Sequence, residues 1–378
     1  MAWIKSRPKP WDRFSNWAPG AAMLVLALAL AVLVAAVLTE RSAIYDAPAA
    51  DVTAAPDVAA APAGAPDEAQ IQSSSRDTDL QLYDRIAQRV RGGENYYQVA
   101  VEEQRARDFP VRPGLAVRLP TLAFITAAIG QWGLFALGIV LVLSTLVAWH
   151  YRLRDAPGGP GRLRYILLLL LIGVVTGFKP QYLVLHEVWA GLLIALSLGL
   201  YRPNRWIWAF LAGVLALAIR EHALPFILLM AVFAWARGNR GEAAAWLGAV
   251  LIFGALLLFH LSLVGQYTTA EDPASPGWMA LRGFGGLTAN IVLSSPLQYL
   301  PGWLAAPLAL LPLIGWAGWR SWFGLTGFLL CLGYGVLFMI AGRDNNFYWA
   351  LIVMPIWFVG YAFVPRALMS LWQSARGN

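Results

Sequence analysis

The sequence predicts an all-α fold, a polytopic membrane helix bundle of about ten spans. Hydrophobic residues make up 59% of the 378 residues and charged residues only 13%. Several apolar runs approach the roughly 17–25 residues that a helix needs to cross a bilayer. Because lipid offers no hydrogen-bond partners, the backbone in these runs must satisfy its own hydrogen bonds, as an α-helix does.

Hydropathy and turn-forming residues locate the individual spans. The first apolar run, 20–38, is longer than the usual signal-peptide core of about 7–15 residues and has no clear cleavage site, which favours an anchor over a secretory signal. Several later runs are short for a full crossing, and such spans can pack where the bilayer is locally thinned. The predicted spans are 20–39, 132–150, 164–178, 187–200, 206–219, 223–236, 243–262, 299–317, 322–340 and 347–364.

Basic residues mark one side of the predicted bundle. The N-terminus, four short loops and the C-terminal tail hold 15 of the 28 Lys and Arg residues but only three of the 21 acidic residues. Lys and Arg favour cytoplasmic loops, so both termini are expected in the cytoplasm of a bacterial inner membrane. The isoelectric point near 9.7 then reports topology and not nucleic-acid binding. The distribution of Lys and Arg also predicts that the apolar segment 115–129 is a re-entrant or interfacial helix. A full crossing there would place the basic loop 152–164 on the periplasmic side.

The chain is therefore divided into six regions. They are a cytoplasmic N-terminus (1–19), a first transmembrane helix (20–39), a disordered periplasmic Ala/Pro tether (40–75), a periplasmic loop with two surface helices and the re-entrant helix (76–130), a transmembrane bundle (131–364) and a cytoplasmic C-terminal tail (365–378).

Two short amphipathic helices are predicted in the periplasmic loop, at the membrane surface. Thr78 to Gln81 fits a capping box that would start the first helix, with Thr78 as its N-cap. Gly92-Gly93 would end it. Asn95 can cap the second helix, and Phe109-Pro110 would end that one.

Polar residues that gather on the periplasmic side are the candidates for function, because ionisable groups near lipid depth are costly. Each has a simpler alternative: a helix cap for the aspartates, an interfacial anchor for the tyrosines, a snorkelling contact for the arginines, an internal ion pair at 220–221 and a connecting turn at 343–346. The candidates are Asp77, Asp79, Tyr83, Glu94, Tyr96, Tyr97, Arg105, Arg112, Arg118, Lys179, His186, Glu187, Arg220, Glu221, Arg343, Asp344, Asn345 and Asn346.

No cofactor is required by any motif. Asp77, Asp79 and His186-Glu187 could supply oxygen and imidazole ligands for a divalent cation, Mg²⁺ or Mn²⁺, but without the regular spacing of a zinc site. Glu187 as the partner of a basic residue is the alternative. The sequence has no P-loop, no G-x-S-x-G, no H-E-x-x-H and no dinucleotide fingerprint. An enzyme without a nucleotide-binding motif must use an already activated substrate.

An Asp on a surface helix after the first span, a Tyr four residues later, a Gly-rich turn and a second surface helix resemble the GT-C superfamily of membrane glycosyltransferases. The residues are Asp79-Leu-Gln-Leu-Tyr83 and Arg91-Gly-Gly-Glu-Asn-Tyr-Tyr97. The arrangement is similar to that of the protein O-mannosyltransferases and the lipid A aminoarabinose transferases. The resemblance covers the N-terminal half, whereas the C-terminal half matches only in its spans and outward loops and lacks a large periplasmic domain.

The resemblance implies a polyprenyl-phosphate-linked sugar donor, a periplasmic lipid, glycan or protein acceptor, and Asp79 as the catalytic base. Arg and Lys residues near the outer surface would hold the lipid phosphate. Inverting transfer needs a base for the acceptor hydroxyl, and a phosphate leaving group needs cationic stabilisation and no general acid. One carboxylate is then sufficient, in contrast to the two of glycosidases.

Two other functions remain open. A polysaccharide polymerase or ligase of the cell envelope would place its basic residues in a large late outer loop, whereas the richest loop here is the first. A transporter or flippase for lipid-linked sugars would carry internal repeats or polar residues near the membrane midplane. The spans here are nearly free of charge, which favours chemistry at one face.

Overall fold

The computed structural model describes residues 10–43 and 68–377, apart from the side chains of residues 39–43, 68–79 and 344. All regular elements in these ranges are helices, which agrees with the predicted all-α class. The α-helices are α1 (Pro19–Ala43), α2 (Glu68–Arg91), α3 (Tyr96–Arg105), α4 (Thr121–Arg154), α5 (Leu163–Val175), α6 (His186–Leu200), α7 (Ile207–Ile219), α8 (Leu224–Ala236), α9 (Arg240–Gly265), α10 (Gly283–Leu293), α11 (Gly302–Gly318), α12 (Trp322–Ile340), α13 (Met354–Trp357) and α14 (Val364–Ala375). The 3₁₀ helices are η2 (Gly114–Ala116), η3 (Pro160–Arg162), η4 (Pro180–Val184), η5 (Glu221–Ala223), η6 (Pro296–Tyr299), η7 (Asp344–Ile352) and η8 (Phe358–Ala362).

Four helical stretches in the described ranges are long and apolar enough to cross a membrane: Pro19–Leu38, Gly114–Arg154, Arg240–Gly265 and Trp322–Ile340. A fifth is added if the bent pair Met354–Ala362 and Val364–Ala375 counts as one span. These stretches indicate a membrane protein. The other predicted spans correspond to helices of 13 to 17 residues, α5 to α8 and α11, so about ten full crossings are not confirmed.

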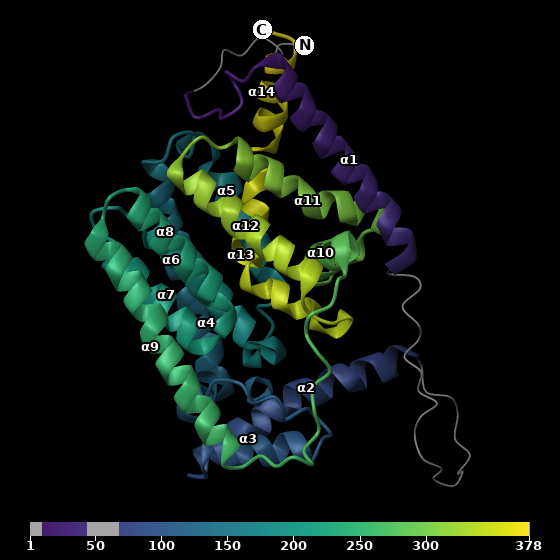
Figure 1. The fold of residues 1–378 in the computed structure, drawn as a ribbon, viewed down its shortest axis with the longest axis vertical. Helices are drawn as coiled ribbons and strands as arrows, with labels where there is room; N and C mark the ends of the chain where they lie inside the picture. Colours follow the sequence, from purple (N-terminus) through teal and green to yellow (C-terminus); the bar gives the residue numbers. More distant parts are fainter. Residues whose placement is uncertain (1–9, 44–67, 378) are drawn as a thin grey trace.

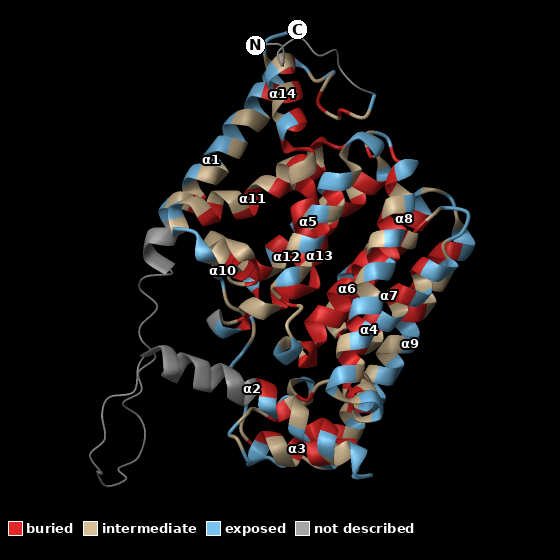
Figure 2. Cartoon of the chain, turned by 180° about the vertical axis from the view of Figure 1, so that it is seen from behind, coloured by how far each residue is buried: buried red, intermediate tan, exposed pale blue. Residues whose placement is uncertain are grey.

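The longest apolar helices lie on the outside of the bundle. Only 11% of the apolar stretch of α1 and 17% of that of α9 is buried, against 50% for α12. Figure 2 shows the same contrast, with α6 and α13 largely buried and α9 largely exposed. Apolar side chains that face outward along a whole helix are stable in contact with lipid.

The described ends of the chain meet at one end of the molecule, and α2 and α3 lie at the other (Figure 1). Arg366 Nη2 lies 2.6 Å from Asp12 Oδ2, and Ser374 Oγ donates to the carbonyl oxygen of Phe14 at 2.6 Å. The predicted C-terminal tail is therefore not an extended segment: most of it forms α14, which packs on α1 and α11.

The last predicted span, 347–364, is not one regular helix. It consists of η7, α13 and η8, followed by a bend of 49° into α14. Pro355 removes a backbone donor, which favours a break. The segment packs closely on α5 and α6: a Cβ at Gly173 would lie 2.2 Å from the Met354 oxygen, and one at Gly191 would lie 2.4 Å from the Leu351 oxygen. Irregular backbone is tolerated at membrane depth where protein covers it.

The first surface helix differs from its predicted start. Helix α2 begins at Glu68, so Thr78 is not its N-cap and the capping-box prediction is wrong. The last eight residues of the predicted tether are helical, and the rest of that tether from residue 44 onward lies outside the described residues. The end of α2 at Gly92-Gly93 is confirmed, with φ of 92° at Gly93.

The second surface helix is confirmed. The Asn95 side chain accepts hydrogen bonds from the backbone of Tyr97 and Gln98 at the start of α3, as predicted. The helix ends at Arg105, earlier than the predicted stop at Phe109-Pro110.

The segment 115–129 is a helix of its own only from Thr121, because the non-helical Gly130 divides α4 into two helices that meet at a kink. Its first residues lie in η2 and its remainder, from Thr121, is the first part of α4. Only Gly130 interrupts α4, with φ 71° and ψ 179°. Helix α10 was not predicted at all, because its sequence GFGGLTANIVL is rich in glycine, which has low helix propensity.

Candidate functional site

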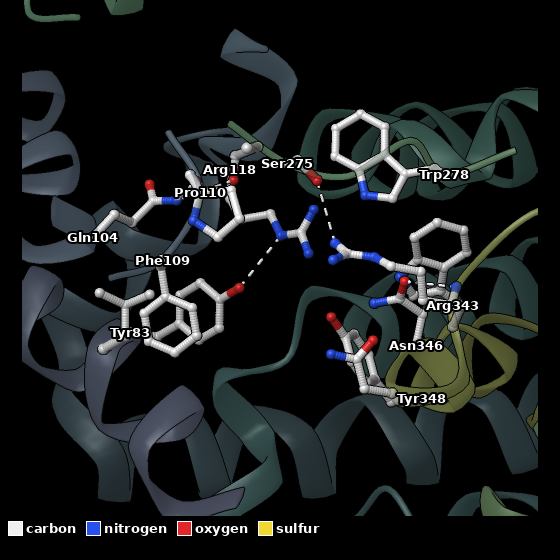
Figure 3. Close-up of a pocket in the computed structure, with 14 residues that line it drawn as sticks. Tyr83, Gln104, Phe109, Pro110, Arg118, Ser275, Trp278, Arg343, Asn346 and Tyr348 are labelled. Atoms are coloured by element: carbon white, nitrogen blue, oxygen red, sulfur yellow. Dashed lines mark hydrogen bonds between the residues drawn. The ribbon is translucent and has the colours of Figure 1, made fainter. Parts of the chain in front are cut away.

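A small pocket lies between α2, the segment that follows α3, the loop 266–282 and the start of η7. Its volume is about 140 Å³, roughly the space of a few water molecules. Two arginines, Arg118 and Arg343, enter it from segments far apart in the sequence (Figure 3). It is lined by Leu82, Tyr83, Gln104, Phe109, Pro110, Ala116, Arg118, Ser275, Trp278, Arg343, Asn345, Asn346, Tyr348 and Trp349.

Arg118 is held from both its backbone and its side chain. It lies between η2 and α4, where its carbonyl oxygen accepts a 2.6 Å hydrogen bond from the Tyr96 hydroxyl. Its Nε donates to the Tyr83 hydroxyl oxygen at 3.3 Å. These contacts fix the stem of the side chain and leave its terminal nitrogens for the pocket.

Arg343 enters the pocket from the loop between α12 and η7. Its backbone N–H donates to Asn346 Oδ1 at 3.0 Å, and its Nη2 donates to Ser275 Oγ at 3.2 Å. Its buried Nε has no hydrogen-bond partner, and the same holds for Nε1 of Trp349 on the pocket wall. Buried donors of this kind are costly unless a ligand pairs with them.

The guanidinium groups of Arg118 and Arg343 face each other (Figure 3). Among the described side chains, no carboxylate lies within 4.0 Å of either group. Two cations at close range repel each other. A pocket of this shape and charge suits a compact anion such as a phosphate.

A larger cavity of about 610 Å³ adjoins this pocket. The two are neighbours that share Tyr83, Asn345 and Tyr348 as lining residues, and together they are called the cleft below. This volume lies within the range of about 300–1,000 Å³ of small-molecule sites. The lining residues are Leu80, Tyr83, Thr176, Lys179, Tyr182, Leu185, Leu293, Ser294, Gln298, Tyr299, Asn345, Phe347, Tyr348 and Leu351.

Arg220 forms a buried ionic cluster behind the cleft. Its side chain is 1% exposed and lies 2.9 Å from Glu187 and 2.6 Å from Glu221. Both expected pairings, of Arg220 with Glu221 and of Glu187 with a basic residue, are confirmed. His186 starts α6, and its ring contacts that of Tyr83 at 5.5 Å. None of these four residues lines either cavity.

Two predicted arginines do not reach the cleft. Arg105 Nε lies 2.6 Å from Asp272 Oδ1, and Arg112 Nε donates to the Asp272 backbone oxygen at 2.9 Å. Arg105, together with the Thr269 N–H, lowers the pKa of Asp272 to about 2. Both arginines therefore fix the loop 266–282.

Three further candidates are also structural. Glu94 pairs with Arg89 at 2.5 Å on the exposed surface. Tyr96 and Tyr97 pack together under α2 in a small second core, with ring centroids 5.3 Å apart. They do not form the wall of a cavity.

Asp77, Asp79 and Asp344 have side chains outside the described residues. The α2 backbone places position 79 one residue before Leu80, which lines the large cavity, and one turn before Tyr83, which lines both. Asn345 and Asn346 line the small pocket, and Lys179 lines the large cavity, as their prediction as binding residues requires.

Several lining residues were not predicted. Ser275 and Trp278 come from the loop 266–282, none of whose residues was among the candidates. Phe347 and Tyr348 directly follow the predicted polar cluster 343–346 and were noted with it as aromatic neighbours, whereas Trp349, the next residue, was not.

No three His, Cys, Asp or Glu side chains gather closely enough to hold a metal ion within the part of the chain that the structure describes. Because two of the proposed ligands, Asp77 and Asp79, fall outside that part, a divalent cation stays a prediction.

Comparison of the chain with models of protein families, with curated proteins and with solved structures found no match.

Proposed function

We propose that the protein is a membrane glycosyltransferase that moves a sugar from a polyprenyl-phosphate donor to a lipid or glycan acceptor. The observation that supports it most is the convergence of Arg118 and Arg343, without a carboxylate partner among the described side chains, beside a cavity of about 610 Å³. The small pocket would hold the donor phosphate, and the larger cavity would receive the sugar and the acceptor.

The chemistry follows from this division. As the glycosidic bond to phosphate breaks, negative charge grows on the leaving oxygen, and two fixed guanidinium groups stabilise it. Asp79 would take the proton of the acceptor hydroxyl, so that the sugar is transferred with inversion. The position of residue 79 on α2, next to Leu80 and one turn from Tyr83, supports this role because both neighbours line the cleft.

The proposed topology has the cleft on the periplasmic face of the bacterial inner membrane and both termini in the cytoplasm. Basic segments that were assigned to the cytoplasm contact one another: Arg162 lies over the ring of Trp11 at 4.2 Å, and the backbone N–H of Arg320 donates to the Trp11 oxygen at 2.7 Å. They lie with α14 at the end opposite α2 and α3 (Figure 1). About ten crossings, some of them short, remain part of the proposal.

The test of the catalytic role compares Asp79→Asn with Asp84→Asn on the same helix. Asp84 accepts a hydrogen bond from Gln131 and lines neither cavity. Purified protein in nanodiscs is given a panel of polyprenyl-phosphate-linked hexoses and pentoses with extracted envelope lipids, and released polyprenyl phosphate is measured. We expect Asp79→Asn to lose about 10²-fold or more of the activity and Asp84→Asn to keep it.

Full activity of Asp79→Asn would remove this carboxylate from the mechanism. If the protein releases no polyprenyl phosphate but moves an intact labelled donor across a liposome membrane, the flippase alternative replaces the enzyme. If the product instead grows by whole preassembled glycans, the polymerase or ligase alternative replaces it.

A further inference from the structure

The larger cavity has a cation of its own. Lys179, directly before η4, lines it, and its Nζ lies 5.6 Å from the centroid of the Tyr182 ring. No carboxylate lies within 4.0 Å of this ammonium group in the described residues. A lysine that faces a cavity without a counter-charge is a binding group for an anion.

Lys179 is separate from the arginine pair. Arg118 and Arg343 line only the small pocket, and Lys179 lines only the large cavity. A single phosphate in the small pocket is therefore served by the arginines, and the lysine is left for a second anionic group.

The rest of the cavity suits a ring that carries hydroxyl groups. Thr176, Ser294, Gln298 and Asn345 supply hydroxyl and amide groups, which can both donate and accept hydrogen bonds. Tyr182 and Tyr299 add aromatic faces with a polar end. Ser294 and Gln298 already donate to the backbone oxygens of Phe347 and Ser295, but a purely hydrocarbon ligand would make no use of the Thr176 hydroxyl or the Asn345 amide.

The large cavity also borders the helix that carries the proposed base. Leu80 on α2 lines the large cavity and not the small pocket, and Tyr83 lines both. Position 79 shares a helix face with Tyr83, because residues four apart lie one turn from each other. An acceptor in the large cavity and a donor phosphate in the small pocket would therefore both lie near this face of α2.

We propose that the acceptor is an anionic sugar, one that carries a carboxylate or phosphate group, and that Lys179 recognises this charge. This inference rests on the proposed function, since it names the acceptor class of the same cleft. Lys179 sets acceptor specificity, while the arginine pair holds the donor.

The experiment measures binding of glucuronate, glucose 6-phosphate and glucose to the protein in phosphatidylcholine nanodiscs, with farnesyl phosphate present as a donor analogue. The wild type should bind the two anionic sugars about tenfold or more tightly than glucose, as expected for a charge-assisted contact. Lys179→Gln should bind all three equally, and Lys179→Arg should retain the preference because it retains the charge. An absent preference in the wild type, or one that survives in Lys179→Gln, would overturn the proposal.

A second arm separates the two sources of negative charge. If nanodiscs that contain phosphatidylglycerol abolish the preference at the same ionic strength, Lys179 is a lipid-headgroup contact and the acceptor proposal fails. If the preference is the same in both kinds of nanodisc, the contact is with the sugar.

Farnesyl phosphate binding, measured alone, separates this inference from the proposed function. Lys179→Gln should bind farnesyl phosphate like the wild type, whereas Arg343→Gln should lose it. A wild type that binds farnesyl phosphate but binds all three sugars equally removes only the acceptor assignment. Failure of the wild type to bind farnesyl phosphate removes the donor assignment and the proposed function with it.

Discussion

Arg220 is the most deeply buried charged side chain near the cleft, and its surroundings explain how this is possible. Glu187, with a side chain 2% exposed, and Glu221 neutralise it from two sides. Moving a charge out of water is costly, so a buried charge is stable only while an oppositely charged partner lies next to it. Removal of one carboxylate therefore costs more than the pair contributes.

We predict that Glu187→Gln lowers the free energy of unfolding by about 1–3 kcal/mol, because Arg220 would keep Glu221 at 2.6 Å but lose its more deeply buried carboxylate partner. Thermal unfolding in nanodiscs measures this. Glu94→Gln is the matched control, since Glu94 pairs with Arg89 on the surface with 47% of its side chain exposed. Equal stability of the two variants would contradict the account.

The sequence alone identified the basic residues of the cleft as candidates. It could not distinguish them from arginines that form ion pairs or hydrogen bonds within the fold. Arg105, Arg112 and Arg118 looked equivalent in the sequence. The first two are engaged by Asp272, which is 160 or more residues away in the chain. A partner so distant cannot be read from local pattern, and only the fold shows that Arg118 is left for the pocket.

At the scale of elements, the break in α4 has a local cause. Gly130 adopts φ 71° and ψ 179°, a conformation essentially restricted to glycine. Arg91, at the end of α2, donates from Nε to the Ala127 oxygen at 2.6 Å and from Nη2 to the Thr126 oxygen at 3.3 Å. The arginine thus satisfies carbonyl groups at the C-terminal end of the helical turn before the break.

We predict that Gly130→Ala destabilises the protein by about 1–3 kcal/mol, the cost of this backbone conformation for a residue with a Cβ. The new Cβ would also lie 3.0 Å from Arg91 Nη2. Gly248→Ala in α9 is the control, because a Cβ there meets nothing within 4 Å. Thermal unfolding compares the two, and an equal effect would show that Gly130 is not under this constraint.

The loop 266–282 should respond to acid through Asp272. Its pKa is lowered from 3.8 to about 2, chiefly by Arg105. A carboxylate with a lowered pKa stabilises the fold above its unfolded pKa and loses that contribution as the pH falls through the folded value. We therefore expect hydrogen exchange in 267–275, corrected for intrinsic rates, to increase between about pH 4 and pH 2.

Asp272→Asn provides the comparison for this effect. The variant has no carboxylate at this position, so its loop should exchange faster already at pH 5 and change little below pH 4. The same acid response in wild type and variant would assign the effect to another group.

The helices whose bounds were predicted most accurately are flanked by charged or polar residues. Helix α12 runs over 322–340 as predicted, and α6 starts at His186, one residue before the predicted 187–200, because apolar runs there end at charged or polar residues. Helix α10 and the segment 344–362 were missed or misjudged because their form depends on burial. Glycine and proline lower the local signal in both, and packing against neighbouring helices determines the outcome.

For the whole molecule, α2, whose residues help to line the cleft, and α14 lie at opposite ends (Figure 1). We predict that single cysteines at these ends react from opposite sides of the membrane. The buried Cys331 is first replaced by Ala, and Glu94→Cys and Arg376→Cys are then made, since both sites are exposed. In right-side-out inner-membrane vesicles, an impermeant maleimide should label Glu94→Cys alone, and labelling of both would refute the topology.

If Arg118 and Arg343 bind the phosphate of a lipid-linked donor, the protein must distinguish a polyprenyl phosphate from the corresponding alcohol. The direct measurement is calorimetric binding of farnesyl phosphate and of farnesol to the protein in phosphatidylcholine nanodiscs. Arg85→Gln/Arg107→Gln is the matched control for Arg118→Gln/Arg343→Gln, because it removes the same charge without touching the cleft. We expect the wild type and the control to bind farnesyl phosphate much more tightly than farnesol, and the cleft variant to bind the two equally. Equal binding of phosphate and alcohol by the wild type, or an unchanged preference in the cleft variant, would contradict it.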